Sequence, residues 1–257
     1  GVIQTSDGTL YGATPTAGTN GYGTVYRLNP DGSGYAIIHT FGASEDGRVP
    51  YCALVQGADG ARYGTTSAGG AHHQGTVFKL SLNGADYLTL YSLNESGLDP
   101  HTPQAGLTQG TDGNLYGTGY GGASSGIGAV FVINTNGTAF AVLHSFTENN
   151  NDGSSPDAAL IQGKDGALYG TTLAGGANGD GTVFRLAPTA PDIMSQPASQ
   201  TGFAGGMASF SVTASGTGPL SYFWQRNGSF IAVCTNSTYT INDVQLVDSG
   251  SQFSCVL

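Results

Sequence analysis

The sequence is poor in positive charge. It holds 7 Lys and Arg against 17 Asp and Glu, for a net charge of −10, and only 9% of its 257 residues are charged. Proteins that bind nucleic acid or anionic membranes use clustered cations, and this chain has few to cluster. The charge balance therefore argues against nucleic acid as a partner.

Long apolar runs are also missing. No stretch approaches the roughly 18 consecutive apolar residues that indicate a membrane-spanning helix, so we expect no direct membrane insertion. Even so, 39% of the residues are hydrophobic, among them 13 Tyr and 11 Phe. That apolar content is enough to form a buried core and argues against a disordered chain.

Glycine, in contrast, is abundant, with 43 residues spread along the chain. Many belong to a tandem repeat in which Asp-Gly, two further residues and Tyr-Gly recur, with the tyrosines at Tyr11, Tyr63, Tyr116 and Tyr169. The tyrosines are 52 (63 − 11), 53 (116 − 63) and 53 (169 − 116) residues apart, so the period is 52 to 53 residues. Residues 1–187 thus divide into four units that start near positions 1, 54, 107 and 160.

Each unit is predicted to form several short strands. A second apolar run of the type Gly-Thr-Val-Phe-x-Leu follows the tyrosine, and three units add a third run at 35–41, 87–93 and 140–146. Runs rich in Val, Ile, Tyr, Phe and Thr between glycine turns are typical of strands, and Asp-Gly predicts a tight hairpin. Four strands in about 50 residues match a propeller blade. We therefore expect an all-β fold, with a β-propeller-like array of about four four-stranded blades.

The best copy of the motif lies at residues 160–186. It runs Leu-Ile-Gln-Gly-Lys-Asp-Gly-Ala-Leu-Tyr-Gly-Thr-Thr-Leu-Ala-Gly-Gly and ends in Gly-Thr-Val-Phe-Arg-Leu. This pattern resembles the GLoVer tandem repeat of bacterial surface proteins, and the resemblance covers roughly residues 1–187. It implies export and an extracellular or cell-surface location. It brings no established catalytic residues.

The composition changes at a proline-spaced linker, residues 188–191. Residues 192–257 resemble a bacterial immunoglobulin-like β-sandwich, with Trp224 as its core tryptophan and Cys255 at its second cysteine position. Val212 stands where that resemblance places the first cysteine, so the usual disulfide cannot form.

The cysteines are few, and only one pair lies in the same predicted domain. Cys234 and Cys255 can form a disulfide, but the sequence does not fix the distance between their Cα atoms. Two separate thiols therefore remain the alternative. Cys52 matches Ala105 and Ala158 in later repeats, which indicates a small buried residue with an inert thiol.

Both predicted domains look incomplete. The fourth unit has no third apolar run, and the immunoglobulin-like segment lacks its last strand. Open β edges promote association, so two explanations remain. The sequence is an excerpt of a longer chain with more blades, or neighbouring copies lend the missing strands in a homo-oligomer or polymer joined by β-strand complementation. We favour the excerpt, and the two explanations can hold together.

Candidate chemical groups are few, and we expect no catalytic residue, bound metal or cofactor. His39 and His144 share a repeat position that Tyr91 fills in the second unit, and a general base cannot be exchanged silently for tyrosine. Acidic loops at 45–47 and 149–153 offer oxygens for calcium but lack the EF-hand order, so calcium there remains open. The repeated aspartates precede glycine in the hairpin turns, which favours a turn-capping role: they are Asp7, Asp59, Asp112 and Asp165.

The candidate ligand-binding residues are four glutamines in the innermost predicted strands: Gln4, Gln56, Gln109 and Gln162. Their side chains can ring a central channel and bind a polar ligand. The alternative is a ladder of side-chain hydrogen bonds between blades. The repeated tyrosines have a similar pair of readings, stacking on sugars or packing in the core.

These observations favour a noncatalytic extracellular structural or adhesive surface protein. The first alternative is a carbohydrate-binding propeller with glycan partners, which clustered exposed Tyr or Trp on one face would support. A polysaccharide hydrolase or lyase ranks third, because it needs acids that converge in a cleft with raised pKa values. The fold class alone does not choose among the three.

Overall fold

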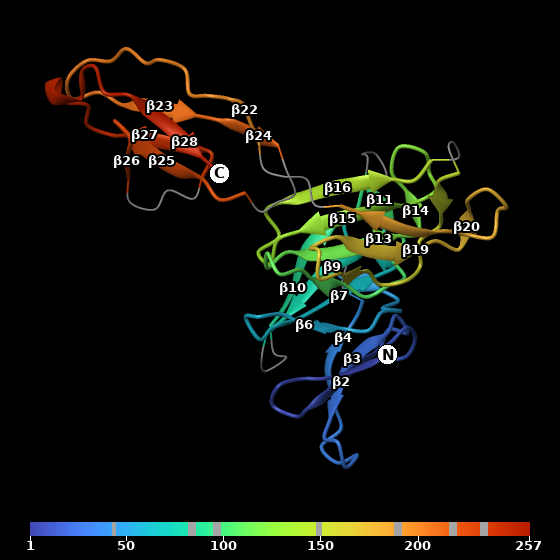
Figure 1. Cartoon of the computed structure of the whole chain (residues 1–257). Helices are drawn as coiled ribbons and strands as arrows, with labels where there is room; N and C mark the ends of the chain where they lie inside the picture. The colour runs from blue at the N-terminus through green and yellow to red at the C-terminus, as the bar shows by residue number, and fades with distance from the viewer. Residues whose placement is uncertain are drawn as a thin grey trace. The chain divides into compact units, whose positions relative to one another are not determined.

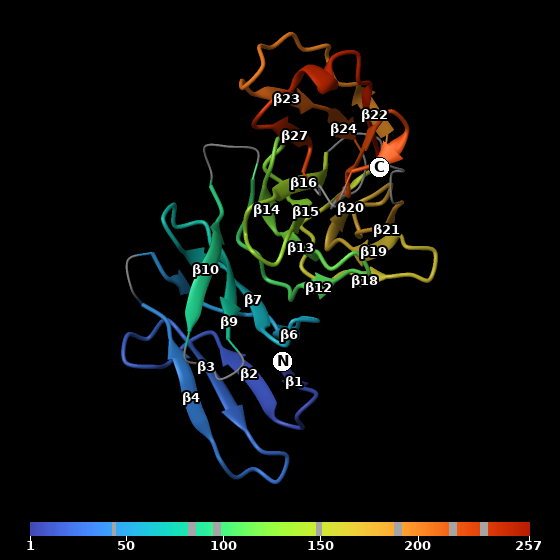
Figure 2. The same cartoon turned by 90° about the vertical axis from the view of Figure 1, so that its left-hand side faces the viewer.

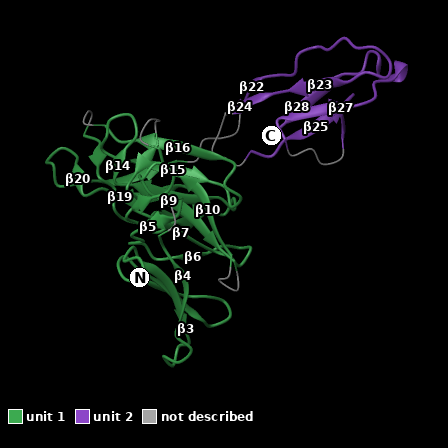
Figure 3. Ribbon diagram, turned by 180° about the vertical axis from the view of Figure 1, so that it is seen from behind, with its two compact units in different colours: residues 1–187 green, residues 188–257 purple. Residues whose placement is uncertain are grey.

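The protein is an all-β structure of two compact units, residues 1–187 (unit 1) and 188–257 (unit 2), which Figure 3 colours separately. The computed structural model describes residues 1–42, 45–81, 86–94, 99–147, 151–187, 192–215, 220–231 and 236–257. Within these ranges there is no α-helix, which confirms the all-β part of the expected fold class, and no helix long and apolar enough to cross a membrane. The predicted linker at 188–191 lies outside the described residues.

Unit 1 contains one antiparallel sheet per repeat (Figure 1). Repeat 1 has β1 (Val2–Gln4), β2 (Leu10–Thr14), β3 (Thr24–Leu28) and β4 (Ala36–Thr40). Repeat 2 has β6 (Val55–Gln56), β7 (Arg62–Thr66), β9 (Thr76–Leu80) and β10 (Tyr87–Ser92). Repeat 3 has β12 (Thr108–Gln109), β13 (Leu115–Gly119), β15 (Ala129–Ile133) and β16 (Phe140–Ser145). Repeat 4 has only β18 (Ile161–Gln162), β19 (Leu168–Thr171) and β21 (Val183–Leu186) in its sheet.

The strands of each sheet pair in chain order. Figure 2 shows the four sheets following one another in an arc, with the short first strands on its inner side and β4, β10 and β16 on its outer side. The first two strands are joined by the predicted Asp-Gly turn. In repeat 1 the Gly8 amide donates to the Thr5 carbonyl at 2.8 Å, with Gly8 at φ +85°, where glycine is favoured.

A β-bulge recurs between the third and fourth strands. In repeat 1, Val25 pairs with His39 and Tyr26 with Ile37, so Ile38 is the extra residue. A bulge breaks the side-to-side alternation of a strand, so Ile38 and His39 both face the next repeat. The same shift occurs in repeats 2 and 3.

Small two-stranded ladders join neighbouring repeats. Each ladder pairs the loop after one repeat's outer strand with the stretch that follows the tyrosine strand of the next repeat. They are β5 (Gly47–Arg48) with β8 (Ala68–Gly69), β11 (Pro100–His101) with β14 (Gly121–Gly122), and β17 (Gly153–Ser154) with β20 (Ala174–Gly175). The backbone itself therefore couples each repeat to the next.

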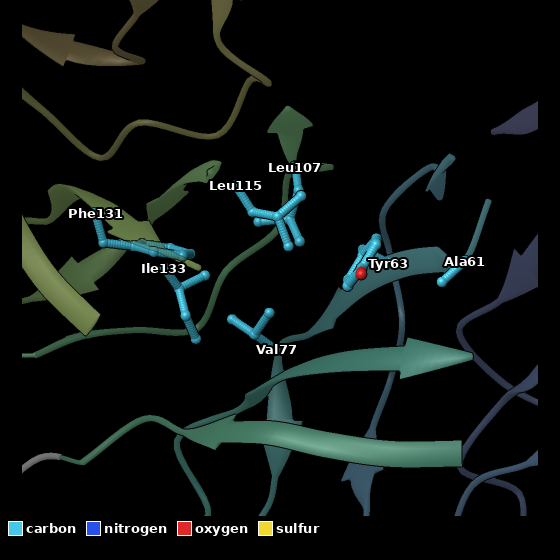
Figure 4. Close-up of a cluster of buried hydrophobic side chains, with 7 residues drawn as sticks. All are labelled: Ala61, Tyr63, Val77, Leu107, Leu115, Phe131 and Ile133. Atoms are coloured by element: carbon cyan, nitrogen blue, oxygen red, sulfur yellow. The ribbon is translucent and has the colours of Figure 1, made fainter. Parts of the chain in front are cut away.

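The apolar cores of unit 1 lie between repeats rather than within them. The first core takes Tyr11, Val25 and Phe41 from repeat 1 and Leu54, Phe78 and Leu80 from repeat 2. Figure 4 shows the second, formed by Ala61, Tyr63 and Val77 of repeat 2 with Leu107, Leu115, Phe131 and Ile133 of repeat 3. The third joins repeats 3 and 4 in the same way. Because full burial of one such side chain contributes about 1.5–3 kcal/mol, a repeat is stabilised mainly by its neighbours.

We call the face of a repeat that packs on the following repeat its trailing face, and the face that packs on the preceding repeat its leading face. The valine of the Gly-Thr-Val motif, such as Val77, marks a trailing face. The phenylalanine that follows it, such as Phe78, marks a leading face. Adjacent strand residues point to opposite sides of a sheet, so one short motif supplies both faces.

Unit 2 is built from short strands around Trp224, which is fully buried. Its sheets pair β22 (Asp192–Ser195) with β24 (Thr213–Ser215), β23 (Ala208–Ser211) with β27 (Thr238–Ile241), and β26 (Ser229–Phe230) and β28 (Phe253–Val256) with β25 (Phe223–Arg226). A single-turn 3-10 helix spans Leu246–Asp248. Val212 and Cys255 lie in the same buried cluster as the tryptophan.

Candidate functional site

Polar side chains gather at both ends of each joint between repeats, at the hairpin turns on the inner side and after the outer strands. They include every histidine, aspartate and glutamine that recurs in the sequence pattern. These joints are therefore the place to look for chemistry in unit 1.

Three of the four candidate glutamines bridge neighbouring repeats. Gln56 Oε1 accepts from the Ser6 amide at 2.9 Å, and Gln109 Oε1 accepts from the Ala58 amide at 2.8 Å. Gln162 Oε1 does the same with the Thr111 amide at 2.8 Å. These bonds are of the kind that the sequence analysis gave as the alternative to ligand binding, hydrogen bonds of side chains between repeats. The binding of a ligand by these glutamines remains a prediction.

The amide nitrogen of three of these glutamines donates a hydrogen bond to the hairpin turn of its own repeat. The Nε2 groups of Gln4, Gln109 and Gln162 donate to the carbonyls of Gly8, Gly113 and Gly166 at 3.1, 2.9 and 3.1 Å. Gln109 and Gln162 thus engage both polar atoms of the amide, whereas the bonds of Gln4 stay within its own repeat.

The repeated aspartates cap the hairpin turns. In all four repeats Oδ1 accepts from the backbone amide two residues later, as Asp59 does from Ala61 at 3.1 Å. In repeats 2 to 4 the other oxygen accepts from the tyrosine hydroxyl, at 2.7 Å from Tyr63 to Asp59. These carboxylates are ordered parts of the turn rather than a ring of free acids.

A cation joins this cluster in two repeats. Lys79 Nζ lies 2.9 Å from Asp59 Oδ2, and Arg185 Nη2 lies 2.8 Å from Asp165 Oδ2. Partial burial alone raises the pKa of Asp59, but its hydrogen bonds with Lys79, the tyrosine and the backbone hold that pKa below its usual value. The hydrogen bond from Arg185 is the main cause that lowers the pKa of Asp165. Both acids are therefore poor candidates for a general acid.

The outer end of each joint holds an aromatic side chain against an aspartate. His39 Nε2 lies 3.1 Å from Asp46 Oδ2, and its ring stacks on Tyr87 of the next repeat at 3.9 Å. In repeat 2 the equivalent Tyr91 stacks on Phe140 of repeat 3 at 4.1 Å. Histidine and tyrosine thus fill the same packing position, which supports a structural role.

The carboxylates of these outer clusters are engaged by the protein. Asp46 Oδ2 also accepts from the Gly42 amide at 3.0 Å, and Asp152 Oδ2 accepts from the Thr147 amide at 3.1 Å. Burial favours the protonated form of Asp46, but its hydrogen bonds with His39 and Tyr87 keep its pKa below the ordinary value. Residues 149 and 150 of the acidic loop lie outside the described residues, so calcium in that loop remains a prediction.

Sequence reasoning missed Arg62. Its side chain is 1% exposed, its guanidinium lies 4.1 Å over the Tyr11 ring of repeat 1, and its Nη2 is 3.8 Å from Asp7 Oδ2. The other repeats have leucine at this position. This replacement of leucine by arginine could have predicted a contact between the two repeats, because a cation in an otherwise apolar position needs a partner across the joint.

Neither the cysteines nor the adjacent loop histidines His72 and His73 form a metal centre among the residues described. No group of three or more His, Cys, Asp or Glu in those ranges could hold a metal ion. Cys52 is a buried thiol, with its Sγ 3.2 Å from both the carbonyl oxygen and the amide nitrogen of Thr65. Burial raises its pKa, which makes it unreactive. Cys234 lies outside the described residues, so its disulfide with Cys255 remains a prediction.

Unit 2 contains an open groove of about 840 Å³. Its walls mix polar side chains such as Gln200 and Asp248 with the apolar Phe210 and Phe253. Its volume lies in the range of small-molecule sites. The sequence pattern gave no sign of it, because its walls come from separate strands and turns that share no motif.

Comparison with known families adds the identity of the repeat. The model of the Gloeobacter/Verrucomicrobia repeat matches residues 1–244. The chain belongs to this repeat family. This confirms the GLoVer-type resemblance, and the match extends past residue 187, where the resemblance was expected to end. No curated protein matches the sequence.

Several solved structures are similar at low identity. A Dyadobacter fermentans protein of unknown function is 13% identical with a TM-score of 0.46, over 100% of this chain and 81% of that chain. A chain of a nidogen/laminin complex is 16% identical with a TM-score of 0.47, over 82% and 73%. A Xanthomonas campestris gluconolactonase is 16% identical with a TM-score of 0.44, over 72% and 55%. At these scores the likenesses carry no conclusion about function.

Proposed function

We propose that this repeat-family member is a noncatalytic structural or adhesive protein of the cell exterior. Its repeats form a propeller-like body of successive β-blades. Unit 2 is an immunoglobulin-like module that serves as a spacer or assembly contact. Copies of the chain associate through shared β-strands.

One observation carries this proposal: the groups that could do chemistry in unit 1 are engaged in holding the repeats together. The glutamines bridge successive repeats, the hairpin aspartates cap turns, and His39 and Tyr91 bond to carboxylates while stacking on the next repeat. A general acid is expected to have a raised pKa. All the aspartate pKa shifts resolved among the described residues are downward.

The open edge of repeat 4 supports strand sharing. Among the described residues β21 pairs only with β19, whereas the equivalent β3, β9 and β15 each have a fourth strand on their outer edge. An unpaired strand edge is a template for another strand. A strand from a neighbouring copy would complete the fourth sheet.

The repeated tyrosines weaken one form of the carbohydrate alternative. Tyr11, Tyr63 and Tyr116 are buried in the joints, so their rings are not available to stack on sugars. The groove of unit 2 keeps carbohydrate binding as the second candidate, since its polar walls offer hydrogen-bonding groups.

Labelling of intact cells tests the proposal. An antibody against the purified chain should label unbroken producing cells, and external protease should remove the signal. Labelling only after cell lysis would refute the surface role. Incubation of the purified chain with a panel of polysaccharides should release no new sugar ends, and a glycan array then tests the second candidate directly.

A further inference from the structure

A histidine and a carboxylate are enclosed together at the joint between repeats 1 and 2. The ring of His39 lies flat on the ring of Tyr87 from repeat 2, with the ring centroids 3.9 Å apart and the planes 5° apart. Its Nε2 is 3.1 Å from Asp46 Oδ2, and the side chains of His39 and Asp46 are 18% and 6% exposed. A charge on this imidazole would therefore act on the carboxylate with little screening by water.

The carboxylate of Asp46 is charged in the pH range where histidine titrates. Burial favours its protonated form, but its hydrogen bonds with His39 and Tyr87 hold its pKa below the ordinary value. Among the described residues its ion-pair partner is His39. A buried charge without a counterion is costly, and protonation of His39 supplies that counterion.

The surroundings of His39 hold few other ionisable groups. Burial raises the pKa of Tyr87, so its hydroxyl stays neutral near neutral pH. The other charged residues of the loop after β4 are Glu45, whose carbonyl oxygen accepts from β10 at 3.4 Å, and Arg48, whose guanidinium lies 4.2 Å over a tyrosine ring of repeat 1. On β3 the residue opposite His39 is Val25, which carries no charge.

The other two joints provide comparisons within the same chain. Between repeats 2 and 3, Tyr91 takes the place of the histidine, with its hydroxyl 2.8 Å from Asp99 Oδ2 and its ring stacked on Phe140. Between repeats 3 and 4, His144 Nε2 again lies 3.1 Å from Asp152 Oδ2, but these side chains are 35% and 23% exposed. Among the described residues the sheet of repeat 4 also has no outer strand to stack on this ring. The three joints therefore hold an enclosed histidine–aspartate pair, a more exposed one and a pair without histidine.

We propose that the joint between repeats 1 and 2 is a pH-sensitive contact that protonation of His39 tightens. Protonation turns the hydrogen bond between His39 and Asp46 into a charge-assisted ion pair and places a cation on the face of Tyr87. The folded chain therefore holds this proton more tightly than the unfolded chain does. The stability gained is full below the ordinary histidine pKa of about 6.5 and is lost as the pH rises above that value.

The consequence is a repeat 1 that is held more firmly in acid than at pH 8. In a repeat array each repeat is stabilised by its neighbours, so a change at one joint alters the opening of the repeat at the end of the array. This inference goes beyond the proposed function and does not depend on the surface role.

Melting temperatures of the full chain between pH 5.5 and 8, followed by the near-ultraviolet tyrosine signal, test the proposal. His39→Tyr copies the side chain that repeat 2 has at this position, and Asp46→Asn removes the charge while keeping the shape of the carboxylate. Lowering the pH from 8 to 5.5 should raise the melting temperature of the parent by about 2–4 °C more than that of either variant. Parent and variants share nearly all of the net charge of −10, so the general effect of acid cancels in this difference.

Two further variants are matched controls. Asp99→Asn removes the carboxylate that Tyr91 contacts, so it should lower the melting temperature without changing its slope with pH. His144→Tyr should flatten the slope clearly less than His39→Tyr, because water screens its more exposed pair.

Either His39→Tyr or Asp46→Asn is enough for the decision, so the test stands if one of them fails to fold. A slope equal to the parent's in these variants would overturn the proposal. An equal loss of slope in Asp99→Asn would also overturn it, because the pH dependence would then come from the carboxylates and not from the histidine.

Discussion

The placement of the cores between repeats makes a quantitative prediction for one pair of valines. Val77 and Val183 occupy the same repeat position, but Val77 is buried between repeats 2 and 3 and Val183 is exposed. Val77→Ala should therefore destabilise unit 1 strongly, and Val183→Ala, the matched control, should hardly change the monomer.

The magnitude follows from the groups removed. Valine to alanine deletes two methyl-sized groups, at about 0.8 kcal/mol of transfer free energy each. The cavity left in a close-packed joint brings the loss to ~2–3 kcal/mol. For a unit of this size that corresponds to a melting temperature lower by about 5–10 °C. At the exposed position the change should stay within about 0.5 kcal/mol.

Urea unfolding at a concentration where the protein is monomeric measures both values. The near-ultraviolet tyrosine signal reports largely on unit 1, which holds most of the 13 tyrosines, whereas Trp224, the one tryptophan, lies in unit 2. Equal losses for Val77→Ala and Val183→Ala would refute the reasoning. They would mean that the cores lie within the repeats and not between them.

Three other predictions concern the joints and turns. Gln109→Ala removes one hydrogen bond between repeats and one within a turn, so unfolding in urea should show a loss of ~1–2 kcal/mol; Gln4→Ala, which breaks only a bond within its own turn, should lose clearly less. Burial, with a hydrogen bond to a carboxylate, raises the pKa of Tyr91 to about 12. The stability that this raised pKa contributes is therefore full below the ordinary tyrosine pKa of about 10 and is lost as the pH rises towards 12. Between these two pH values the melting temperature of Tyr91→Phe should fall less steeply with pH than that of the parent. An equal slope for the two proteins would contradict this assignment of the Tyr91 pKa. Gly75→Ala would place a Cβ 2.3 Å from a backbone carbonyl oxygen at φ +103°, so its melting temperature should drop far more than that of Gly113→Ala, which has φ +83° and no neighbour within 4 Å.

The repeat made much of unit 1 predictable. The Asp-Gly turns and the Gly-Thr-Val-Phe motif define local structure through backbone conformation and strand alternation, both of which depend on neighbouring residues. The absence of a third apolar run after Leu186 likewise agrees with the three-stranded sheet of repeat 4. These features depend on short stretches of sequence, which is why the sequence was enough.

Contacts across the joints were harder to predict. The sequence left two roles open for the repeated glutamines, ligand binding and hydrogen bonds between repeats. Choosing between them requires the position of the neighbouring hairpin turn, whose backbone amide is the partner. The bulge that turns His39 towards Tyr87 and the burial of Arg62 depend on the packing of two repeats. No pattern within one repeat contains that information.

The most direct test of the account is the mass of the native protein, measured together with electron microscopy of the same preparation. The account predicts particles whose mass is an integral multiple of that of the single chain, because copies associate through shared β-strands. A homogeneous preparation of single chains would contradict it.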